Sequence, residues 1–498
     1  MRPLCFIFLV LVFLPGAPAG RLASWSDDRI PGQVRGPSGP LAGAHVRWKG
    51  EAASVVTDAA GNFRLPRGPA GVSRLVAWKK GYFIGGAAAS ANPLVIELHA
   101  LPAQDCEAYA WVDPSPNRAG QHNCANCHTD IYQEWNRSAH AHSARNPRLL
   151  NLYDGTDRHG RRAGWSLLAD NPDGAGVCNS CHAPTADTYS DLRQLEGVKR
   201  LGVHCDYCHK IESAGQGKIG LTHGRFGYQV RRPAEGQLFF GPLADVDRGD
   251  DAFAPVYSQS VYCASCHEGI VFGVHVYSTY SEWQESPAGK EGKQCQSCHM
   301  APTGKMTNMA PGRGGIARDP NTLANHRFFA GSQEDMLRAA LTVAPTVERK
   351  DGRVHVQVEV RADNVGHRVP TGFVDRHLLL VVEGLPEADA PAVKPVDGPT
   401  LPNVAGQGLA GRAGRLYANL CKDELGRSPV PFWRALNETE DTRLQPGKPD
   451  RSTYVFPAEV RKVRLRLLYR KFWDEVAREK DWPDTTITVH EQVVDVGR

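Results

Sequence analysis

Five short segments of the chain share one pattern, in which two cysteines are separated by two residues and a histidine directly follows the second cysteine. They read CANCH (124–128), CNSCH (178–182), CDYCH (205–209), CASCH (263–267) and CQSCH (295–299). Ten of the 13 cysteines in the 498 residues belong to these segments. Thiol and imidazole groups bind metals, and thiols also form covalent bonds, so the repeated pattern predicts a repeated cofactor site.

The spacing within each segment is typical of covalent haem attachment. Two thiols two residues apart can each form a thioether with a vinyl group of one haem, and the adjacent histidine can then bind the iron as an axial ligand. We therefore predict five covalent haem c groups with their iron. The predicted attachment cysteines are Cys124, Cys127, Cys178, Cys181, Cys205, Cys208, Cys263, Cys266, Cys295 and Cys298. The predicted proximal iron ligands are His128, His182, His209, His267 and His299.

Other uses of a CxxC pair fit this sequence less well. Zinc ribbons use such pairs, but they do not need a histidine at the next position. Redox-active CxxC pairs are usually single and lie in a βαβ fold. Disulfide frameworks do not repeat a CxxC pair with a fixed histidine. A histidine directly follows each of the five CxxC pairs, which favours haem c over a zinc ribbon, a redox-active pair or a disulfide framework.

The five motifs lie between residues 101 and 340, where regular strands are scarce, loops are rich in glycine, and helical turns are expected, as in 129–146. This segment offers about 48 residues for each motif. A chain of that length cannot fill its interior with apolar side chains alone. We therefore expect a loop-rich, mainly helical cytochrome domain over 101–340, with the haems as much of its core.

The flanking segments have the alternating pattern of β-structure, so we expect a multidomain protein. Short alternating runs separated by turn residues predict an all-β domain over 20–100. The segments HVQVEVRADN (355–364), HLLLVVEGL (377–385) and KVRLRLLYR (462–470) predict strands of a mainly-β domain over 341–498.

The first 19 residues have the features of a cleaved signal peptide. Arg2 precedes an apolar run from Leu4 to Leu14, and Ala17-Pro18-Ala19 is a small-residue cleavage site. The apolar run is short for a bilayer span, which needs about 20 residues. We expect export to the periplasm or the medium, which agrees with haem c because this cofactor is attached outside the cytoplasm. No later segment is apolar for eighteen residues, so we expect no transmembrane segment in the mature chain.

The charge balance indicates no nucleic-acid partner, because the formal net charge is only +4. Two cysteines of the mature chain lie outside the motifs, Cys106 and Cys421. A disulfide between them is one interpretation in an oxidising compartment, and two free buried thiols are the other.

A second axial ligand for each iron has to come from the 14 histidines outside the motifs. Five of them lie at strand-like positions, where a surface or core role is expected: His45, His99, His355, His377 and His490. Nine remain as candidates: His122, His140, His142, His159, His204, His223, His275, His326 and His367. Met306 and Met309 are alternative iron ligands, although ordinary packing is the favoured interpretation for both.

Three segments resemble multihaem cytochromes related to cytochrome c-554 and hydroxylamine oxidoreductase. They are CHTDIYQEWNRSAHAHSA (127–144), GVHCDYCHK (202–210) and TYSEWQESPAGKEGKQCQSCHM (279–300). NHRFFAG (325–331) resembles the His-x-Phe segment after the last haem of that family, and NVGHRVPTGF (364–373) resembles a loop at the start of a β-domain in related cytochromes. The resemblance covers roughly residues 105–380.

The resemblance implies His140 and His326 as distal iron ligands. His367, His204 and His223 follow as the next candidates, with His122 close behind. We expect His142, His159 and His275 to face solvent or haem propionates instead. In the first β-region, PLAGAHV (40–46), TDAAGNF (57–63) and KKGYF (79–83) resemble the carboxypeptidase regulatory-like domain, a transthyretin-type β-sandwich that carries no catalytic residues.

The chain also departs from the cytochrome family. Its five motifs match neither the tetrahaem member nor the eight-haem oxidoreductase, and its two β-domains are absent from both. No CxxCK motif is present, so the lysine-ligated haem of pentahaem nitrite reductase is missing, and no tyrosine can be assigned to a haem cross-link. These departures argue against assigning catalytic residues.

The main hypothesis is therefore an exported pentahaem c-type cytochrome that transfers electrons. Its expected partners are other redox proteins or quinol-linked electron donors and acceptors. The alternative is a multihaem oxidoreductase in which one haem lacks a protein distal ligand and acts on a small nitrogen or sulfur compound. An iron with an open coordination site would discriminate between the two.

Overall fold

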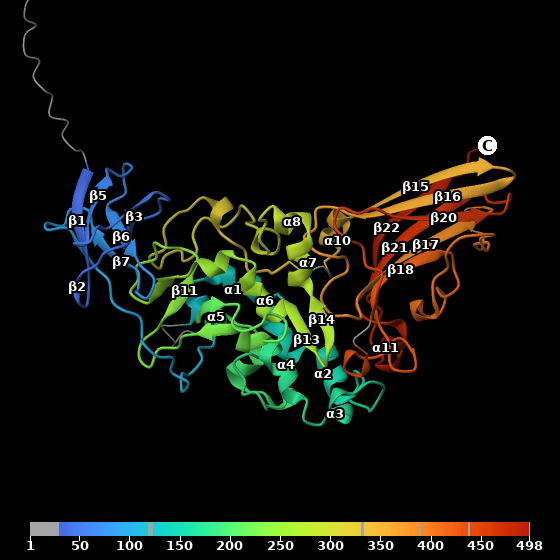
Figure 1. The fold of residues 1–498 in the computed structure, drawn as a ribbon, viewed down its shortest axis with the longest axis horizontal. Coiled ribbons are helices and arrows are strands. Elements are labelled where there is room, and N and C mark those ends of the chain that lie inside the picture. Colours follow the sequence, from blue (N-terminus) through green and yellow to red (C-terminus); the bar gives the residue numbers. More distant parts are fainter. Residues whose placement is uncertain (1–28, 118–122, 330–332, 388–389, 437–438, 498) are drawn as a thin grey trace, which may run out of the picture.

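A computed structural model describes residues 29–117, 123–329, 333–387, 390–436 and 439–497. The ribbon is elongated, with strand-rich regions at both ends and a region of short helices between them (Figure 1). The predicted signal peptide, residues 1–19, lies outside the described residues, as does His122. Within the described ranges, no helix is both long and apolar enough to cross a membrane.

The N-terminal region consists of two small sheets around one core. One sheet has the order β2-β1-β5, with β8 parallel to β1, and the other has the order β4-β3-β6-β7. Alternation along the strands places Phe63 and Leu65 of β5 inside, beside Val34, Val46 and Leu75. The strands are β1 (Arg29–Gly36), β2 (Gly39–Pro40), β3 (His45–Trp48), β4 (Ser54–Val56), β5 (Asn62–Pro66), β6 (Arg74–Trp78), β7 (Gly85–Ala88) and β8 (Val95–Glu97).

The central region is built from short helices and three two-stranded ribbons. Its α-helices are α1 (Thr129–Asn136), α2 (Pro147–Asp154), α3 (Leu167–Asp170), α4 (Ala175–His182), α5 (Cys205–Cys208), α6 (Val261–His267), α7 (Thr279–Glu285), α8 (Pro287–Lys290) and α9 (Gln296–His299). Its 3-10 helices are η1 (Cys124–Asn126), η2 (His140–Arg145), η3 (Leu192–Gln194), η4 (Gly197–Leu201), η5 (Gly224–Gly227), η6 (Pro255–Ser258) and η7 (Pro320–Thr322). The ribbons pair β9 (Ile211–Ala214) with β10 (Tyr228–Val230), β11 (Phe239–Gly241) with β12 (Asp251–Phe253), and β13 (Glu268–Val271) with β14 (Val274–Ser278).

Local signals explain where these short helices begin and end. The side chain of Asn146 accepts hydrogen bonds from the backbone N–H groups of Arg148 and Leu149, and Pro147 occupies the first turn of α2. The helix ends at Gly155, whose φ of 75° is in the left-handed region. The helical turns expected over 129–146 are present as α1 and η2.

The C-terminal region contains a three-stranded sheet, β15-β16-β20, and a five-stranded sheet, β19-β18-β17-β21-β22. Every residue of β17 is buried, because the core of Val356, Leu380 and Leu465 covers one face and Leu401 packs on the other. The elements are α10 (Glu334–Ala340), β15 (Leu341–Lys350), β16 (Arg353–Ala362), β17 (His377–Leu385), η8 (Asn403–Ala405), β18 (Gly414–Cys421), η9 (Phe432–Arg434), β19 (Thr439–Asp441), β20 (Asp450–Phe456), β21 (Lys462–Arg470), α11 (Asp474–Glu479) and β22 (Ile487–Asp495).

Both end regions contact the central region. On the N-terminal side, Asp245 and Asp247 of the central region form ion pairs with Arg47, Lys49 and Arg74. On the C-terminal side, one hydrophobic cluster joins residues of α2, α3 and the segment between them to Trp433, Trp473 and Trp482. The chain therefore folds as a central region held between two strand-rich regions.

Candidate functional site

The five CxxCH segments all lie at helical turns. α4, α6 and α9 end at His182, His267 and His299, His209 directly follows α5, and the first segment begins in η1. Residues three apart in a helical turn are neighbours on one face, so each turn brings its two cysteines to the same side. Each histidine then leaves the turn beside its own cysteine pair.

Backbone carbonyls orient three of the five motif histidines. Nδ1–H of His128 donates to the carbonyl of Met309 at 2.9 Å, and Nδ1–H of His209 donates to that of Phe240 at 2.7 Å. His299 makes the same contact with the carbonyl of Phe329. A hydrogen bond at Nδ1 fixes the tautomer and leaves Nε2 free to bind a metal. These carbonyls come from distant segments, and the sequence carries no local signal for them.

Two pairs of imidazoles face each other at the separation expected for axial ligands of one metal. The ring centroids of His140 and His267 are 6.2 Å apart, with an angle of 61° between the ring planes. The centroids of His299 and His367 are also 6.2 Å apart, at 18°. With metal–nitrogen bonds of about 2 Å on each side, two axial imidazoles place their centroids about 6 Å apart. Each pair therefore has room for one metal atom between its rings.

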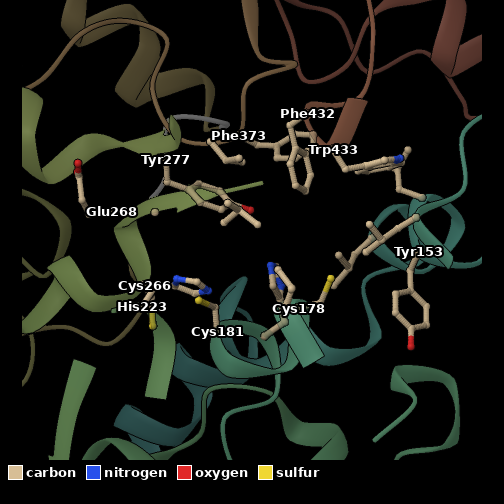
Figure 2. A pocket seen from close by; sticks show the side chains of 18 residues that line it. Tyr153, Cys178, Cys181, His223, Cys266, Glu268, Tyr277, Phe373, Phe432 and Trp433 are labelled. Carbon is tan, nitrogen blue, oxygen red and sulfur yellow. The ribbon is translucent and has the colours of Figure 1, made fainter. Parts of the chain in front are cut away.

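A third pair of histidines, His182 and His223, lines an apolar cavity with Cys178 and Cys181. The cavity encloses about 670 Å³, including its opening to solvent. Figure 2 shows the cysteine sulfurs along one wall and Tyr277, Phe373 and Phe432 on the opposite side. Apolar walls, two thiols and two imidazoles are the groups that a covalently bound haem needs.

His204 and His326 complete the set of five predicted distal ligands. His204 is completely buried, and within the described residues neither of its ring nitrogens has a hydrogen-bond partner. Its ring packs edge-on against Trp111, with 6.0 Å between centroids. Nδ1 of His140, His223 and His326 is likewise buried without a hydrogen-bond partner among the described atoms. Unpaired buried polar atoms are costly, so the two unpaired ring nitrogens of His204 favour a further bonding partner at that residue.

The protein interior keeps five of the proximal and distal candidates neutral, which is the form that binds a metal. Burial lowers the pKa of His140, His204 and His367 to about 4. The same desolvation lowers the pKa of His267 and His326 to about 3, with further lowering of the His267 pKa by His140 and His299. Neutral imidazole binds iron without having to release a proton.

The remaining candidates lie in different surroundings. His142 is exposed and contacts Arg145, His159 pairs with Asp481 at the surface, and His275 pairs with Glu268. Cys106 and Cys421 are both free thiols in this structure. Met309 contributes its backbone carbonyl to His128, as described above.

Cysteines of different motifs contact one another. The thiols of Cys124 and Cys205, of Cys181 and Cys266, and of Cys263 and Cys295 lie close enough to shift each other's pKa. Tyr262, from the helix that holds the fourth motif, donates its hydroxyl to the carbonyl of Cys208 at 3.0 Å. The five motifs therefore form one connected cluster, with the fourth motif next to the second, third and fifth.

The residues of the five motifs and the candidate distal histidines fit haem c. Paired thiols on helical turns, imidazoles with free ring nitrogens and apolar walls match both the covalent and the axial bonds of this cofactor. No group of three or more histidine, cysteine or acidic side chains converges to hold a bare metal ion within the described ranges.

Comparisons with known proteins agree with this chemistry. Residues 123–210 match the model of the family described as cytochrome c554 and c-prime. A penta-heme cytochrome c552 from Thermochromatium tepidum has a similar structure, with a TM-score of 0.57 and 23% sequence identity over 75% of this chain and 97% of that chain. At this identity the likeness shows a shared fold. The curated proteins contain no significant match.

Three of the CxxCH motifs lie inside the family match, and two more follow it along the chain. The family match over residues 123–210 therefore supports a c-type cytochrome with several haems.

Proposed function

We propose that this protein is an exported pentahaem c-type cytochrome that transfers electrons through covalently bound haems. The proposal rests on the number of histidines that are placed to act as axial ligands. Five motif histidines are accompanied by five candidate distal imidazoles, and two of the pairs already face each other at 6.2 Å. The count of five also agrees with the structurally similar penta-heme cytochrome c552.

Haem c supplies one-electron redox chemistry, and bis-histidine ligation suits electron transfer because it leaves no iron position for a substrate. In this proposal the proximal ligands are His128, His182, His209, His267 and His299. The distal ligands are His140, His204, His223, His326 and His367. The structure supports the pairs His140 with His267, His299 with His367, and His182 with His223. The ten motif cysteines form the thioethers.

Contacts between motifs support a branched order of the haems. Contact of Cys124 with Cys205 favours adjacency of the first and third haems. The fourth motif contacts the second through Cys181 and the fifth through Cys263. Electrons that enter at one end of the cluster then have a continuous route through the fourth haem.

The flanking regions have supporting roles in this proposal. Residues 20–100 form a regulatory-like β-sandwich that docks on the cytochrome domain of 101–340, and the β-domain of 341–498 closes the other side. Residues 1–19 direct export and are removed, which places the protein in the periplasm or outside the cell. Its partners are other redox proteins or quinol-linked donors and acceptors.

The proposal is tested by a haem count together with electron paramagnetic resonance of the oxidised holoprotein. We expect five covalent haems per chain, all low-spin. A high-spin ferric signal of about one haem per chain that changes on addition of nitrite or hydroxylamine would replace the electron carrier with an enzyme that has one open iron site.

A further inference from the structure

The loop that carries His367 lies between the central and C-terminal regions and contacts both. On the central side, a Cβ atom added at Gly366 would lie 3.4 Å from Cδ1 of Trp283 in α7, so the loop backbone rests directly on that helix. On the C-terminal side, the backbones of Val369 and Leu444 exchange two hydrogen bonds, of 2.9 and 3.0 Å. The imidazole of His367 is thus presented to His299 by a loop clamped on two sides.

One buried ion pair joins the two sides of this clamp. Nη1 of Arg443, just after β19, lies 2.7 Å from Oε1 of Glu282 in α7. The two side chains are only 6% and 4% exposed. Asp441 supports the guanidinium through a second contact of 2.8 Å. A buried pair with additional hydrogen bonds has one defined geometry, in contrast to a surface pair.

The ion pair also contacts the His367 loop directly. The hydroxyl of Thr371 donates to Oε2 of Glu282 at 2.7 Å, and Arg443 donates to the carbonyl of Pro370 at 3.4 Å. Arg368, the residue after His367, forms an ion pair with Asp441. The loop is therefore held at the residues directly following the imidazole.

The orientation of the His367 ring is fixed as well. Its Nδ1–H donates to the carbonyl of Arg368 at 2.9 Å, which leaves Nε2 for a metal. Its plane is inclined by only 18° to that of His299. A displacement of about 1 Å is enough to spoil a ligand geometry of this kind.

We propose that Glu282 and Arg443 are positioning residues that set His367 opposite His299, so that docking of the C-terminal region completes the axial ligation of the fifth haem. This inference rests on the proposed function, in which both histidines bind that iron. The fifth haem then has one iron ligand from the central region, His299, and one from the C-terminal region, His367. The ion pair makes the position of His367 depend on how the C-terminal region docks.

The test compares single variants of the full-length holoprotein by electron paramagnetic resonance and by potentiometric titration, with covalent haem counted in each. Arg443→Met and Glu282→Gln should keep five haems, lose the low-spin signal of one of them and show a high-spin ferric signal of up to one haem per chain. Arg443→Lys should restore most of the low-spin signal. Thr371→Val, which removes only one hydrogen bond to Glu282, should have a smaller effect in the same direction.

A matched control lies at the same interface. Arg434 pairs with Asp170 of α3 at 2.6 Å, and Arg434→Met should leave all five haems low-spin. His367→Ala gives the reference spectrum, and adding Arg443→Met to it should change nothing further. The titration should show one altered potential in Arg443→Met and none in Arg434→Met.

The outcomes separate the two proposals. If His367→Ala keeps five low-spin haems, the ligand assignment in the proposed function is wrong. If His367→Ala loses one low-spin haem but Arg443→Met, Glu282→Gln and Thr371→Val all match wild type, the positioning role is wrong and the ligand assignment stands. If Arg443→Met yields no holoprotein, Glu282→Gln and Thr371→Val decide the question by the same signals.

Discussion

His140 and His142 lie two residues apart in η2, yet their surroundings are opposite. A ring nitrogen of His140 is buried without a hydrogen-bond partner in the described chain, and the ring faces that of His267 at 6.2 Å between centroids. His142 is exposed and contacts Arg145. The tight turn of η2 therefore separates one histidine that points inward from one that points to solvent.

This difference provides a matched pair of variants. We predict that His140→Ala converts one of five low-spin haems to a high-spin form, because the iron held by His267 loses its sixth ligand. His142→Ala should keep all five low-spin. Electron paramagnetic resonance, with covalent haem counted in parallel, measures both. Identical spectra of the two variants would remove His140 from the ligand set.

A fully buried ion pair lies beside the third motif. Nζ of Lys210 contacts Oδ1 of Asp206, and neither side chain is exposed. Asp206 also accepts hydrogen bonds from the backbone of Val112 at 2.8 Å and from the hydroxyl of Tyr109 at 3.0 Å. Removing one partner of such a pair leaves an uncompensated buried charge, which costs about 3–5 kcal/mol.

We therefore predict that Lys210→Met lowers the free energy of unfolding of the holoprotein by about 3–5 kcal/mol. Guanidinium denaturation followed by circular dichroism measures the change. Lys199→Met is the control, because Lys199 and its partner Asp187 are 41% and 82% exposed and such pairs contribute little. Equal denaturation midpoints for the two variants would contradict the prediction.

The sequence predicted the strands and the CxxCH motifs but not the contacts between distant segments. The reason is that sequence patterns depend on residues that are close together in the chain. A nearly continuous apolar run predicted the strand at 377–385, and alternation predicted that at 462–470. The structure places them at β17 and β21 with the same bounds. The CxxCH spacing is equally local, so it predicted attachment residues directly. Their role as haem ligands stays a prediction, since the structure contains only the protein.

Contacts between distant segments could not be predicted in this way. Glu282 and Arg443 are 161 positions apart, and their pairing depends on how the central and C-terminal regions dock. The carbonyls of Met309, Phe240 and Phe329 that orient the motif histidines have no side-chain signature at all. Predicting them requires the path of the backbone in space, which local periodicity does not contain.

Asp375 predicts a pH dependence of stability. Its side chain is buried, Oδ2 has no hydrogen-bond partner among the described residues, and burial raises its pKa to about 8. In the unfolded chain an aspartate releases its proton near pH 4. Between about pH 4 and pH 8 the folded state therefore binds more protons than the unfolded state, and the contribution of this group to stability falls as the pH rises.

We predict that Asp375→Asn removes the loss of stability between pH 4 and pH 8, because the asparagine side chain cannot ionise. The free energy of unfolding of the variant relative to wild type should rise by up to about 1.4 kcal/mol per pH unit between pH 4 and pH 8. Denaturant titrations at pH 5, 6, 7 and 8 measure the difference. The exposed Asp397→Asn should follow the wild-type curve, and parallel curves for Asp375→Asn and wild type would refute the prediction.

The N-terminal region offers a last prediction, since its contact with the central region depends on two buried aspartates. Asp245 is fully buried and pairs with Arg318 of its own region at 2.8 Å and with Arg47 across the interface at 3.6 Å. Asp247 contacts Lys49 at 2.6 Å and Arg74. All the cross-interface partners lie on or directly beside strands β3 and β6, so one acidic loop holds one face of the N-terminal region.

We predict that Asp247→Asn loosens this contact without disturbing the haems. Loss of about 1.4 kcal/mol at the interface corresponds to a tenfold increase in the population of the undocked form. Limited proteolysis should then cleave between the two regions about tenfold faster than in wild type, while the haem count and the low-spin signals stay unchanged. Glu51→Ala, an exposed change in the turn after β3, is the control and should be cleaved at the wild-type rate. Unchanged cleavage of Asp247→Asn would mean that the ion pairs of Asp247 do not hold the two regions together.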